Sequence, residues 1–344
     1  MKRLRKLRAG DWVEVRSRDE ILATLDKNGR LEGLPFMPQM FQYCGQRFRV
    51  FKRAHKTCDT VNVTGGRRLA NGIHLDLRCD GQAYGGCQAA CLIFWKEAWL
   101  KPVREENQPP EFMLRAKAPW CTEEDVWKGT GTQDLPAGAE VKYTCQATQL
   151  PYFTSLLLWR DIGQYVEDYT SGNVTLRRMF SGFVYSAYYH FSREGKLFSR
   201  PLRRFYDRFQ GLRRGTSYPR KSGLIPIGDP TPNCNLNLQP GELVRVKPYE
   251  EILKTVQTDG NNRGLYFDAE LVPYCGGTYR VKARVTTFVD ENTGKLRTLK
   301  TPAVMLEGVC CQSRYSEHRM FCPRAIYSWW REIWLERVSE STPH

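Results

Sequence analysis

Long hydrophobic runs are missing from this sequence of 344 residues. No stretch reaches the roughly 18 apolar residues that a membrane-spanning helix requires. The basic N-terminus, residues 1–10, also lacks the apolar segment of a secretory signal peptide. We therefore expect a cytoplasmic protein without a transmembrane segment. In that compartment its 12 cysteines favour metal binding over disulfides.

Recognisable catalytic signatures are equally scarce. The glycine-rich stretch at residues 128–132 lacks the Lys-Ser or Lys-Thr ending of a phosphate-binding loop, and the sequence has neither a dinucleotide fingerprint nor a serine nucleophile elbow. The remaining candidates for catalysis are Cys145 as a nucleophile, His190 as its base, and Asp161. Because their spacing is not diagnostic, a transferase-type biosynthetic enzyme with its site in the middle of the chain is the alternative hypothesis.

Negative charge is in short supply. The sequence has 52 Lys and Arg residues against 37 Asp and Glu residues, which gives a net charge of +15. Most of this excess lies in two segments: residues 1–10 hold five cations and no acid, and residues 193–221 hold ten cations and two acids. Clustered positive charge indicates a polyanionic partner, because solubility alone needs no clustering.

What the sequence does contain is an internal repeat with an offset of 231 positions. Matching pairs at this offset are Gly10 and Gly241, Glu20 and Glu251, Gly33 and Gly264, Cys44 and Cys275, and Arg53 and Arg284. The offset becomes 235 at the Trp-rich segments that end the copies, residues 95–100 and 330–335. We place the copies at residues 9–104 and 240–339, on either side of an unrepeated segment at residues 105–237.

Each copy carries four metal-ligand side chains at matched positions. The two sets are Cys44, Cys79, Cys87 and Cys91, and Cys275, Cys310, His318 and Cys322. One matched position exchanges Cys87 for His318, which zinc tolerates and a disulfide does not. The pattern predicts two structural zinc ions, each with two ligands four positions apart on one helical face, and Cys311 is the alternative to Cys310. Buried free cysteines, the competing interpretation, do not explain the matched spacing.

The strand pattern of the copies predicts their fold. Each copy opens with an alternating segment, residues 10–15 and 241–246, which is typical of a half-buried strand. Short strands separated by glycine turns favour a small, strongly bent β-barrel. We predict an α+β protein in which two zinc-stabilised small β-barrel-like repeats flank an α-rich central domain.

Helices are expected in the central segment. Thr122 and Asp125 have the spacing of a capping box at a helix start. Ser155 is expected to cap an amphipathic helix, because apolar residues follow it at spacings of three or four. A second helix is predicted at residues 174–191, and Pro201 fits the first turn of a third, basic helix.

The basic helix is expected to bind the polyanion. The candidate residues are Arg200, Arg203, Arg204, Arg208, Arg213 and Arg214. Guanidinium groups bind phosphate, and interleaved rings such as Phe205 and Phe209 suit stacking on bases. In the competing interpretation these rings pack inward. Arg203, Arg204 and Arg208 remain exposed in both cases.

Several stretches of the chain form a recognisable set. They are Asn262-Arg263-Gly264-Leu265 through Pro273-Tyr274-Cys275-Gly276, Phe321-Cys322-Pro323-Arg324-Ala325-Ile326 through Trp330-Arg331-Glu332-Ile333-Trp334, and Cys145-Gln146-Ala147-Thr148 through Ser171-Gly172-Asn173. This set resembles an uncharacterised bacterial family of duplicated zinc-binding proteins, often encoded among polysaccharide or natural-product biosynthesis genes. The resemblance implies service in a biosynthetic pathway and assigns no reaction. With the charge distribution, it leads us to expect a binding or scaffold protein for RNA or another phosphorylated or anionic ligand, alone or beside a protein partner.

Overall fold

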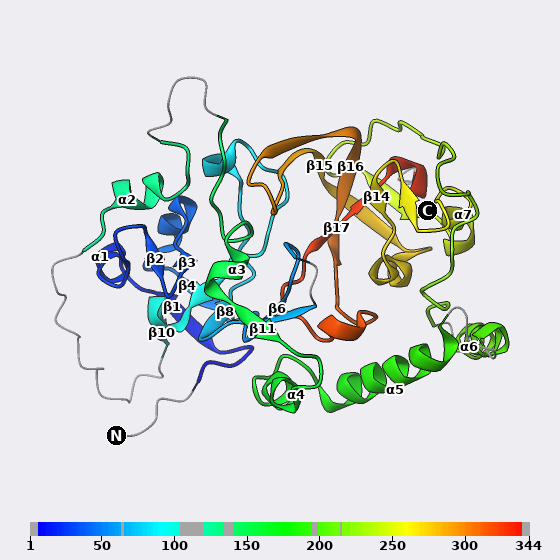
Figure 1. Ribbon diagram of the computed structural model, residues 1–344, viewed down its shortest axis with the longest axis horizontal. Coiled ribbons are helices and arrows are strands. Elements are labelled where there is room, and N and C mark those ends of the chain that lie inside the picture. The colour runs from blue at the N-terminus through cyan, green and yellow to red at the C-terminus, as the bar shows by residue number, and fades with distance from the viewer. Residues whose placement is uncertain are drawn as a thin grey trace, which may run out of the picture. The chain divides into compact units, whose positions relative to one another are not determined.

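The computed structural model describes residues 6–62, 65–103, 120–133, 140–193, 199–213 and 215–338 (Figure 1). This part of the chain divides into two compact units. The first unit comprises the residues up to Leu176 together with Thr287–Thr298 and Phe321–Arg324. The second comprises Arg177–Thr286, Leu299–Met320 and the residues from Ala325 onward. No helix in the described ranges is both long and apolar enough to cross a membrane.

The first unit is built from short elements. Its strands are β1 (Trp12–Val15), β2 (Arg30–Leu31), β3 (Leu34–Pro35), β4 (Arg47–Arg49), β5 (Lys52–Arg53), β6 (Lys56–Cys58), β7 (Gly66–Arg68), β8 (Gly72–His74), β9 (Trp95–Lys96), β10 (Leu100–Pro102) and β11 (Ser155–Leu157). Its helices are α1 (Arg18–Leu22), α2 (Glu123–Lys128), α3 (Leu150–Phe153) and α4 (Ile162–Thr170), with 3₁₀ helices η1 (Pro38–Tyr43), η2 (Gln82–Tyr84) and η3 (Glu97–Trp99).

Strand β1 organises the first unit. It lies between β10 and β4 in an antiparallel sheet, with Val13 opposite both Pro102 and Phe48. Val13 and Val15 are fully buried because successive side chains of a strand point to opposite faces. The other strands form small antiparallel sheets in the orders β5–β8–β9, β6–β7–β11 and β2–β3.

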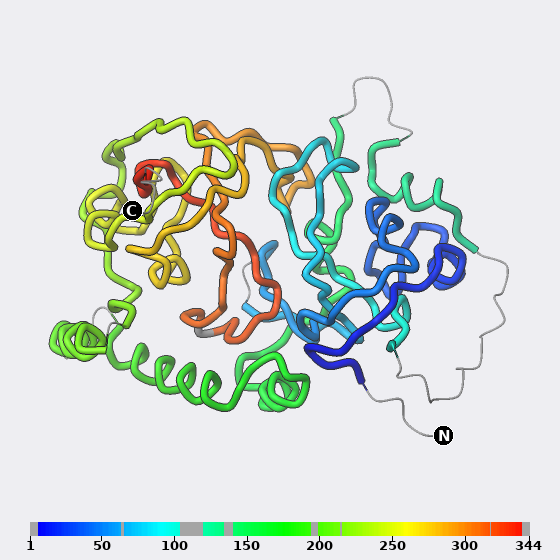
Figure 2. Tube along the Cα trace, turned by 180° about the vertical axis from the view of Figure 1, so that it is seen from behind, coloured from blue at the N-terminus to red at the C-terminus, as the bar shows by residue number. Residues whose placement is uncertain are grey.

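The second unit has longer elements. Its helices are α5 (Leu176–Ser192), which begins at the boundary, α6 (Ser199–Leu212) and α7 (Tyr249–Leu253), with 3₁₀ helices η4 (Ala269–Tyr274), η5 (Glu317–Arg319) and η6 (Glu332–Trp334). Its strands are β12 (Leu243–Val246), β13 (Asn261–Asn262), β14 (Leu265–Tyr266), β15 (Thr278–Val289), β16 (Leu296–Cys310), β17 (Tyr327–Trp330) and β18 (Leu335–Arg337). They form one sheet in the order β17–β16–β15–β12–β18 and a pair, β13–β14. The hairpin of β15 and β16 is drawn in orange tones in Figure 2.

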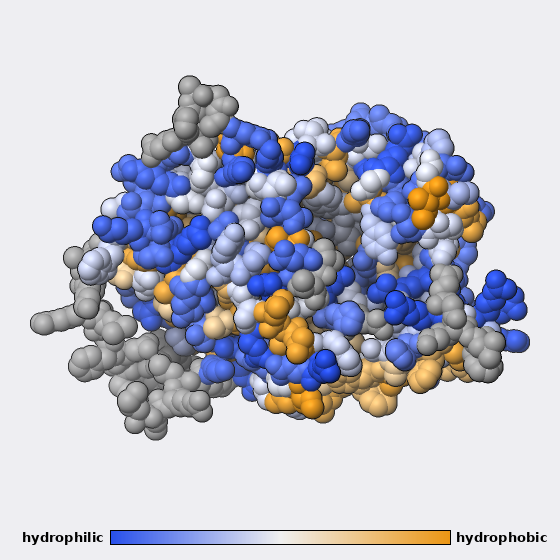
Figure 3. All heavy atoms as spheres, viewed as in Figure 1, coloured by the Kyte–Doolittle hydropathy of each residue, from blue (hydrophilic) through white to orange (hydrophobic). Residues whose placement is uncertain are grey.

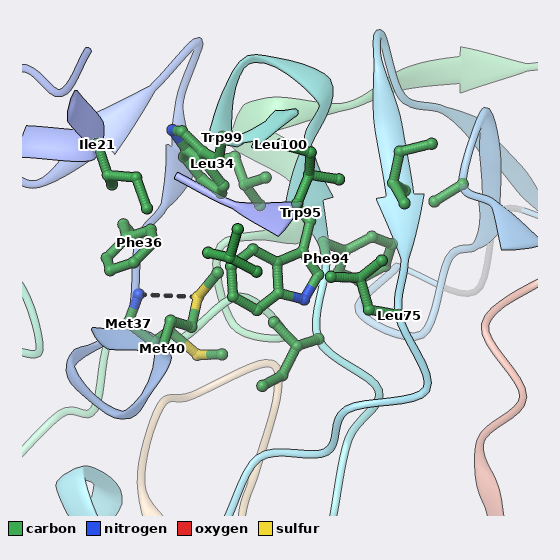
Figure 4. Close-up of a cluster of buried hydrophobic side chains, with 14 of the residues drawn as sticks. Ile21, Leu34, Phe36, Met37, Met40, Leu75, Phe94, Trp95, Trp99 and Leu100 are labelled. Atoms are coloured by element: carbon green, nitrogen blue, oxygen red, sulfur yellow. Dashed lines mark hydrogen bonds between the residues drawn. The ribbon is translucent and has the colours of Figure 1, made fainter. Parts of the chain in front are cut away.

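Corresponding elements recur at the offset of the sequence repeat. The pairs β1 and β12, α1 and α7, β2 and β13, β3 and β14, and η1 and η4 start 231 positions apart, and η3 and η6, and β10 and β18, start 235 apart. The cores correspond as well. Phe36 contacts the rings of Trp95 and Trp99 edge-on in the first unit (Figure 4), as Phe267 contacts those of Trp330 and Trp334 in the second. All four tryptophans are fully buried.

The prediction of two zinc-stabilised β-barrel-like repeats is wrong, although the α+β class agrees with the structure. In the described residues every sheet is open, and a barrel requires a sheet that closes on itself. Turns interrupt the chain after two to four residues in most strands of the first unit, so the strands pair in separate small sheets. No three His, Cys, Asp or Glu side chains among these residues are arranged to hold a metal ion.

The helix predictions for the central segment are mostly confirmed. Thr122 caps α2, since its hydroxyl and the Asp125 carboxylate form the reciprocal bonds of a capping box, and α5 and α6 occur where predicted. The helix predicted to start at Ser155 is wrong. That residue lies in β11, which pairs with β7, and α4 begins only after Asp161, whose carboxylate accepts a bond of 2.9 Å from the Gly163 N–H.

Candidate anion-binding site

A cavity of about 260 Å³ in the second unit combines cations with aromatic rings. Its wall includes Arg193, Arg203, Arg220, Lys221, Tyr189, Tyr249, Tyr266 and Phe267. One acid, Asp259, also lines it, but this carboxylate accepts bonds of 2.8 and 3.0 Å from Asn261 within its own turn. The side-chain bond from Asn261 and its backbone bond lower the pKa of Asp259. The lining therefore carries more positive than negative charge.

Widely separated segments form this wall. Tyr189 lies near the end of α5, Arg203 lies in α6, and residues 219–222 form a loop beside α7. The Tyr249 hydroxyl holds that loop, because it accepts a bond of 3.1 Å from the Lys221 N–H and donates one of 3.2 Å to the Pro219 carbonyl. The loop cations are thereby fixed against the second repeat.

Arg220 is a cation of the cavity wall with one unsatisfied donor. Its guanidinium lies 4.9 Å from the ring centre of Tyr189, and its Nη2 donates to the Tyr315 carbonyl at 2.5 Å. Its Nε is buried and has no hydrogen-bond partner in the part of the chain that the structure describes. Burial lowers the pKa of Arg220, but Tyr189 and Tyr185 outweigh this effect, and the pKa lies above its usual value. The group stays charged.

The charges of the two neighbouring cations are less available. The Nζ of Lys221 forms ion pairs with Asp207 at 2.9 Å and Glu250 at 3.4 Å. Arg203 donates from Nε to the Ser192 carbonyl at 3.0 Å, which directs its side chain inward from α6. Among Arg203, Arg220 and Lys221, Arg220 is therefore the cation whose charge is most available to an anion.

Tyr266 supplies an accessible ring. Its side chain is 48% exposed, and burial of the remainder raises the pKa of its phenol, which stays neutral. Gly260, at φ +87°, makes room for this ring, since a Cβ there would lie 2.7 Å from Tyr266 Cε2. The rings of Tyr249 and Phe267, which also line the cavity, stack with their centres 5.8 Å apart.

The structure separates the predicted polyanion-binding residues. Arg203 lines the cavity, whereas Arg200, Arg204, Arg208 and Arg213 are exposed and lie outside it, and Arg214 lies outside the described residues. Arg220 and Lys221 belong to the basic segment but were not among the predicted site residues. Tyr249 and Tyr266 had no sequence signal for a site, because only long-range packing brings them to the cavity.

The zinc prediction fails in the first unit for a geometric reason. Cys79, Cys87 and Cys91 line a small cavity of about 40 Å³ together with Cys145, whereas Cys44, at the end of η1, does not. Residues 87–91 are not helical, so the expected shared helical face does not form. The sulfur of Cys79 instead accepts a hydrogen bond of 3.1 Å from Gln39 Nε2. Burial raises the pKa of the Cys79 thiol to about 12.

The second predicted set, Cys275, Cys310, His318 and Cys322, is also divided. Cys275, Cys310 and His318 belong to the second unit, and Cys322 belongs to the first. Cys275 packs against the second core, where burial raises its pKa to about 12. Cys322 accepts a bond of 3.1 Å from the Cys58 N–H. Cys311, the alternative ligand, lies 3.6 Å from the Ser313 hydroxyl.

The three catalytic candidates, Cys145, Asp161 and His190, lie in different surroundings and are not brought together in one site. Burial raises the pKa of the Cys145 thiol, which is opposite to the shift that activates a nucleophile. Asp161 caps α4 and forms an ion pair with Arg68 at 2.7 Å, and it does not line the cavity of Cys145. His190 lies exposed on α5 beside Phe191. The first-unit cavity is also too small for an organic substrate.

Comparison with known proteins gives no family for this chain. The sequence matches no protein-family model and no curated protein.

Proposed function

We propose that the protein binds a polyanion that carries aromatic bases, an RNA strand, in the cavity of the second unit. The supporting observation is the wall itself, where Arg220 and Arg203 alternate with tyrosine rings. Guanidinium groups bind phosphate, and an accessible ring such as Tyr266 stacks on a base. A volume of about 260 Å³ is close to that of small ligand pockets, so it accommodates about one nucleotide of a single strand and not a duplex.

The charge outside the cavity supports a strand over an isolated nucleotide. Arg200, Arg204, Arg208 and Arg213 are exposed on the same unit. A net charge of +15 attracts polyanions over distances of about a Debye length. Because the sequence resembles a bacterial family often encoded among biosynthesis genes, we also propose that this binding serves a biosynthetic pathway.

The experiment measures fluorescence anisotropy of a labelled single-stranded RNA across a salt series, with the full chain and two cavity variants. Arg220→Gln should reduce the slope of log affinity against log salt by about 0.7, because one phosphate contact is lost. Tyr266→Ala should weaken binding by about 1–3 kcal/mol at every salt concentration, because one stacked base is lost. Arg245→Gln, an exposed arginine of the same unit outside the cavity, is the matched control.

Two outcomes decide the proposal. If Arg220→Gln and Tyr266→Ala bind RNA like Arg245→Gln while circular dichroism shows them folded, the cavity does not bind the strand. If a nucleoside monophosphate displaces the RNA with the affinity of the strand itself, the ligand is a single nucleotide.

A further inference from the structure

Helix α6 turns Arg203, Asp207 and the ring of Tyr206 toward the protein and exposes a row of apolar side chains to solvent. Inward, Arg203 bonds to the Ser192 carbonyl at 3.0 Å, and the Asp207 carboxylate accepts from the Tyr218 N–H at 2.7 Å. Outward, Phe205 and Leu212 are 63% and 84% exposed, and Phe209 lies between them on the same face. A helix that packs on a protein core turns most of its large apolar side chains inward. The outward row of α6 is therefore an apolar surface that its own unit leaves exposed.

Helix α5, which contacts α6 in the same unit, also exposes apolar side chains. Phe180 and Phe191 are 72% and 66% exposed, and Val184 is exposed with them, whereas Tyr185 and Ser192 are buried on the inner side. In Figure 3 hydrophobic residues gather along α5. Scattered exposed apolar residues need no explanation, but rows along two neighbouring helices mark an interaction surface.

The charges beside the apolar row have one sign. Arg204 and Arg208, four positions apart, follow one edge of the row on α6. Arg213 lies at the other edge, with its guanidinium 4.8 Å from the ring centre of Phe209. The sequence of α5 has no acid, and the acid of α6, Asp207, is paired with Lys221. The surface is thus apolar, edged by arginines and poor in negative charge.

We propose that α5 and α6 dock this surface on an anionic lipid bilayer. An amphipathic helix with aromatic and leucine side chains on one face and arginines beside them lies in the bilayer interface, where the arginine stems stay in the apolar layer and the guanidinium groups reach lipid phosphates. No helix in the described ranges can span the bilayer, so the association is peripheral.

Charge complementarity selects the bilayer among the candidate occupants. A second copy would oppose Arg204 and Arg208 with its own arginines, which repel. RNA would use the arginines and stack on the rings, but it has no use for the aliphatic side chains of Val184 and Leu212. An anionic bilayer satisfies the apolar row and its arginine edges together.

Tyr189 of α5 and Arg203 of α6 also line the cavity, but Arg220 and Tyr266, whose variants test RNA binding, do not belong to the docking helices, so the two proposals can be tested separately. The test is co-sedimentation of the full chain with vesicles of phosphatidylcholine alone and with vesicles of equal parts phosphatidylcholine and phosphatidylglycerol. The apolar variant is Phe205→Gln, Phe209→Gln and Leu212→Gln combined, since glutamine preserves helix propensity. The matched control replaces Leu224 and Ile227 with Gln, two exposed apolar residues of the same unit outside both helices.

We expect the chain to bind the anionic vesicles, the apolar variant to lose at least tenfold in partition coefficient, and the control to bind normally. Arg204→Gln with Arg208→Gln should lose about 25-fold, because each cation near an anionic surface contributes about fivefold. Equal binding by the apolar variant and the control would overturn the proposal. So would an apolar variant that loses RNA binding and retains vesicle binding. Arg220→Gln should bind vesicles normally, which separates failure here from failure of the RNA proposal.

Discussion

The indole nitrogen of Trp99 donates a hydrogen bond of 3.0 Å to the hydroxyl of Thr24. That hydroxyl donates in turn to the Ile21 carbonyl at 2.7 Å. Trp334 and Thr255 repeat the first bond at 3.0 Å in the second unit. Because both indoles are fully buried, each threonine satisfies a donor that water cannot reach. The duplicated sequence thus preserves a polar contact inside the core as well as the strand pattern.

Replacing either threonine with valine should destabilise its own unit by about 1–3 kcal/mol, because the shape is kept while a buried N–H loses its acceptor. Thr24→Ser and Thr255→Ser retain the hydroxyl and serve as controls. Urea unfolding, followed by tryptophan fluorescence, measures the effect. Equal midpoints for Thr24→Val and Thr24→Ser would show that this bond adds nothing to stability.

A pH-dependent loss of stability should arise from His74. The ring is fully buried in β8, its Nδ1 lies 2.8 Å from the Ile93 carbonyl, and burial lowers its pKa to about 3. In the unfolded chain a histidine titrates near pH 6.5, so between about pH 6.5 and 3 only the unfolded state gains the proton. Stability should therefore fall as pH decreases through this window, by about 1.4 kcal/mol per unit from this residue.

The second repeat supplies the control for His74, since Met305 occupies the position 231 residues later. The free energy of unfolding of His74→Met should differ from that of the natural chain by a constant above pH 7. As pH falls from about 6.5 to 5, the free energy of unfolding of His74→Met should decrease less than that of the natural chain. A difference independent of pH would mean that the folded state accepts the proton.

Local patterns in the sequence were sufficient to predict the elements that depend on local chemistry. The capping box of Thr122 and Asp125 and the alternating strand of β1 are examples. Ser155 was misplaced because its pairing partner, Arg68 in β7, is 87 positions away in sequence and no local pattern contains it. Tertiary pairing there overrides helix periodicity, and Asp161 provides the actual cap.

The site was harder to predict than the fold. The arginine cluster contributes Arg203 to the cavity wall. The sequence placed Arg203 on the exposed side with Arg204, but contacts with Ser192 and Tyr218 turn it inward. The cysteine spacing failed for a related reason. Equal offsets preserve the position of a thiol along the chain. Metal binding also requires that the thiols point toward one common centre, and the irregular backbone at residues 87–91 changes the direction in which they point.

Gly260 should be required for the shape of the cavity. Its φ of +87° makes any side chain strained, and a Cβ would also collide with the ring of Tyr266 at 2.7 Å. Gly264→Ala is the matched control, because φ there is +78° and a Cβ would meet nothing within 4 Å. Gly264→Ala should lose about 1–2 kcal/mol of unfolding free energy, and Gly260→Ala should lose at least as much because of the collision. Only Gly260→Ala should also weaken RNA binding, and equal RNA affinities would show that the position of Tyr266 is irrelevant to the ligand.

The ion pair of Lys56 and Asp168 should join α4 to β6. The Nζ and Oδ2 atoms are 2.6 Å apart, Gln164 accepts a second bond from the ammonium at 3.1 Å, and all three side chains are buried. Burial lowers the pKa of Lys56, while Asp168 acts to raise it, so the charged form depends on its partner.

Lys56→Met leaves the buried Asp168 carboxylate with only the His55 imidazole, 3.1 Å from its Oδ1, and should cost about 3–5 kcal/mol of unfolding free energy. Lys56→Met with Asp168→Asn removes both charges and should cost less than Lys56→Met alone, since no buried carboxylate is left without its ammonium. A double-mutant cycle with urea unfolding measures the coupling. If the two substitutions add without coupling, the pair does not hold α4 on β6, and the apolar contacts of the helix account for its attachment.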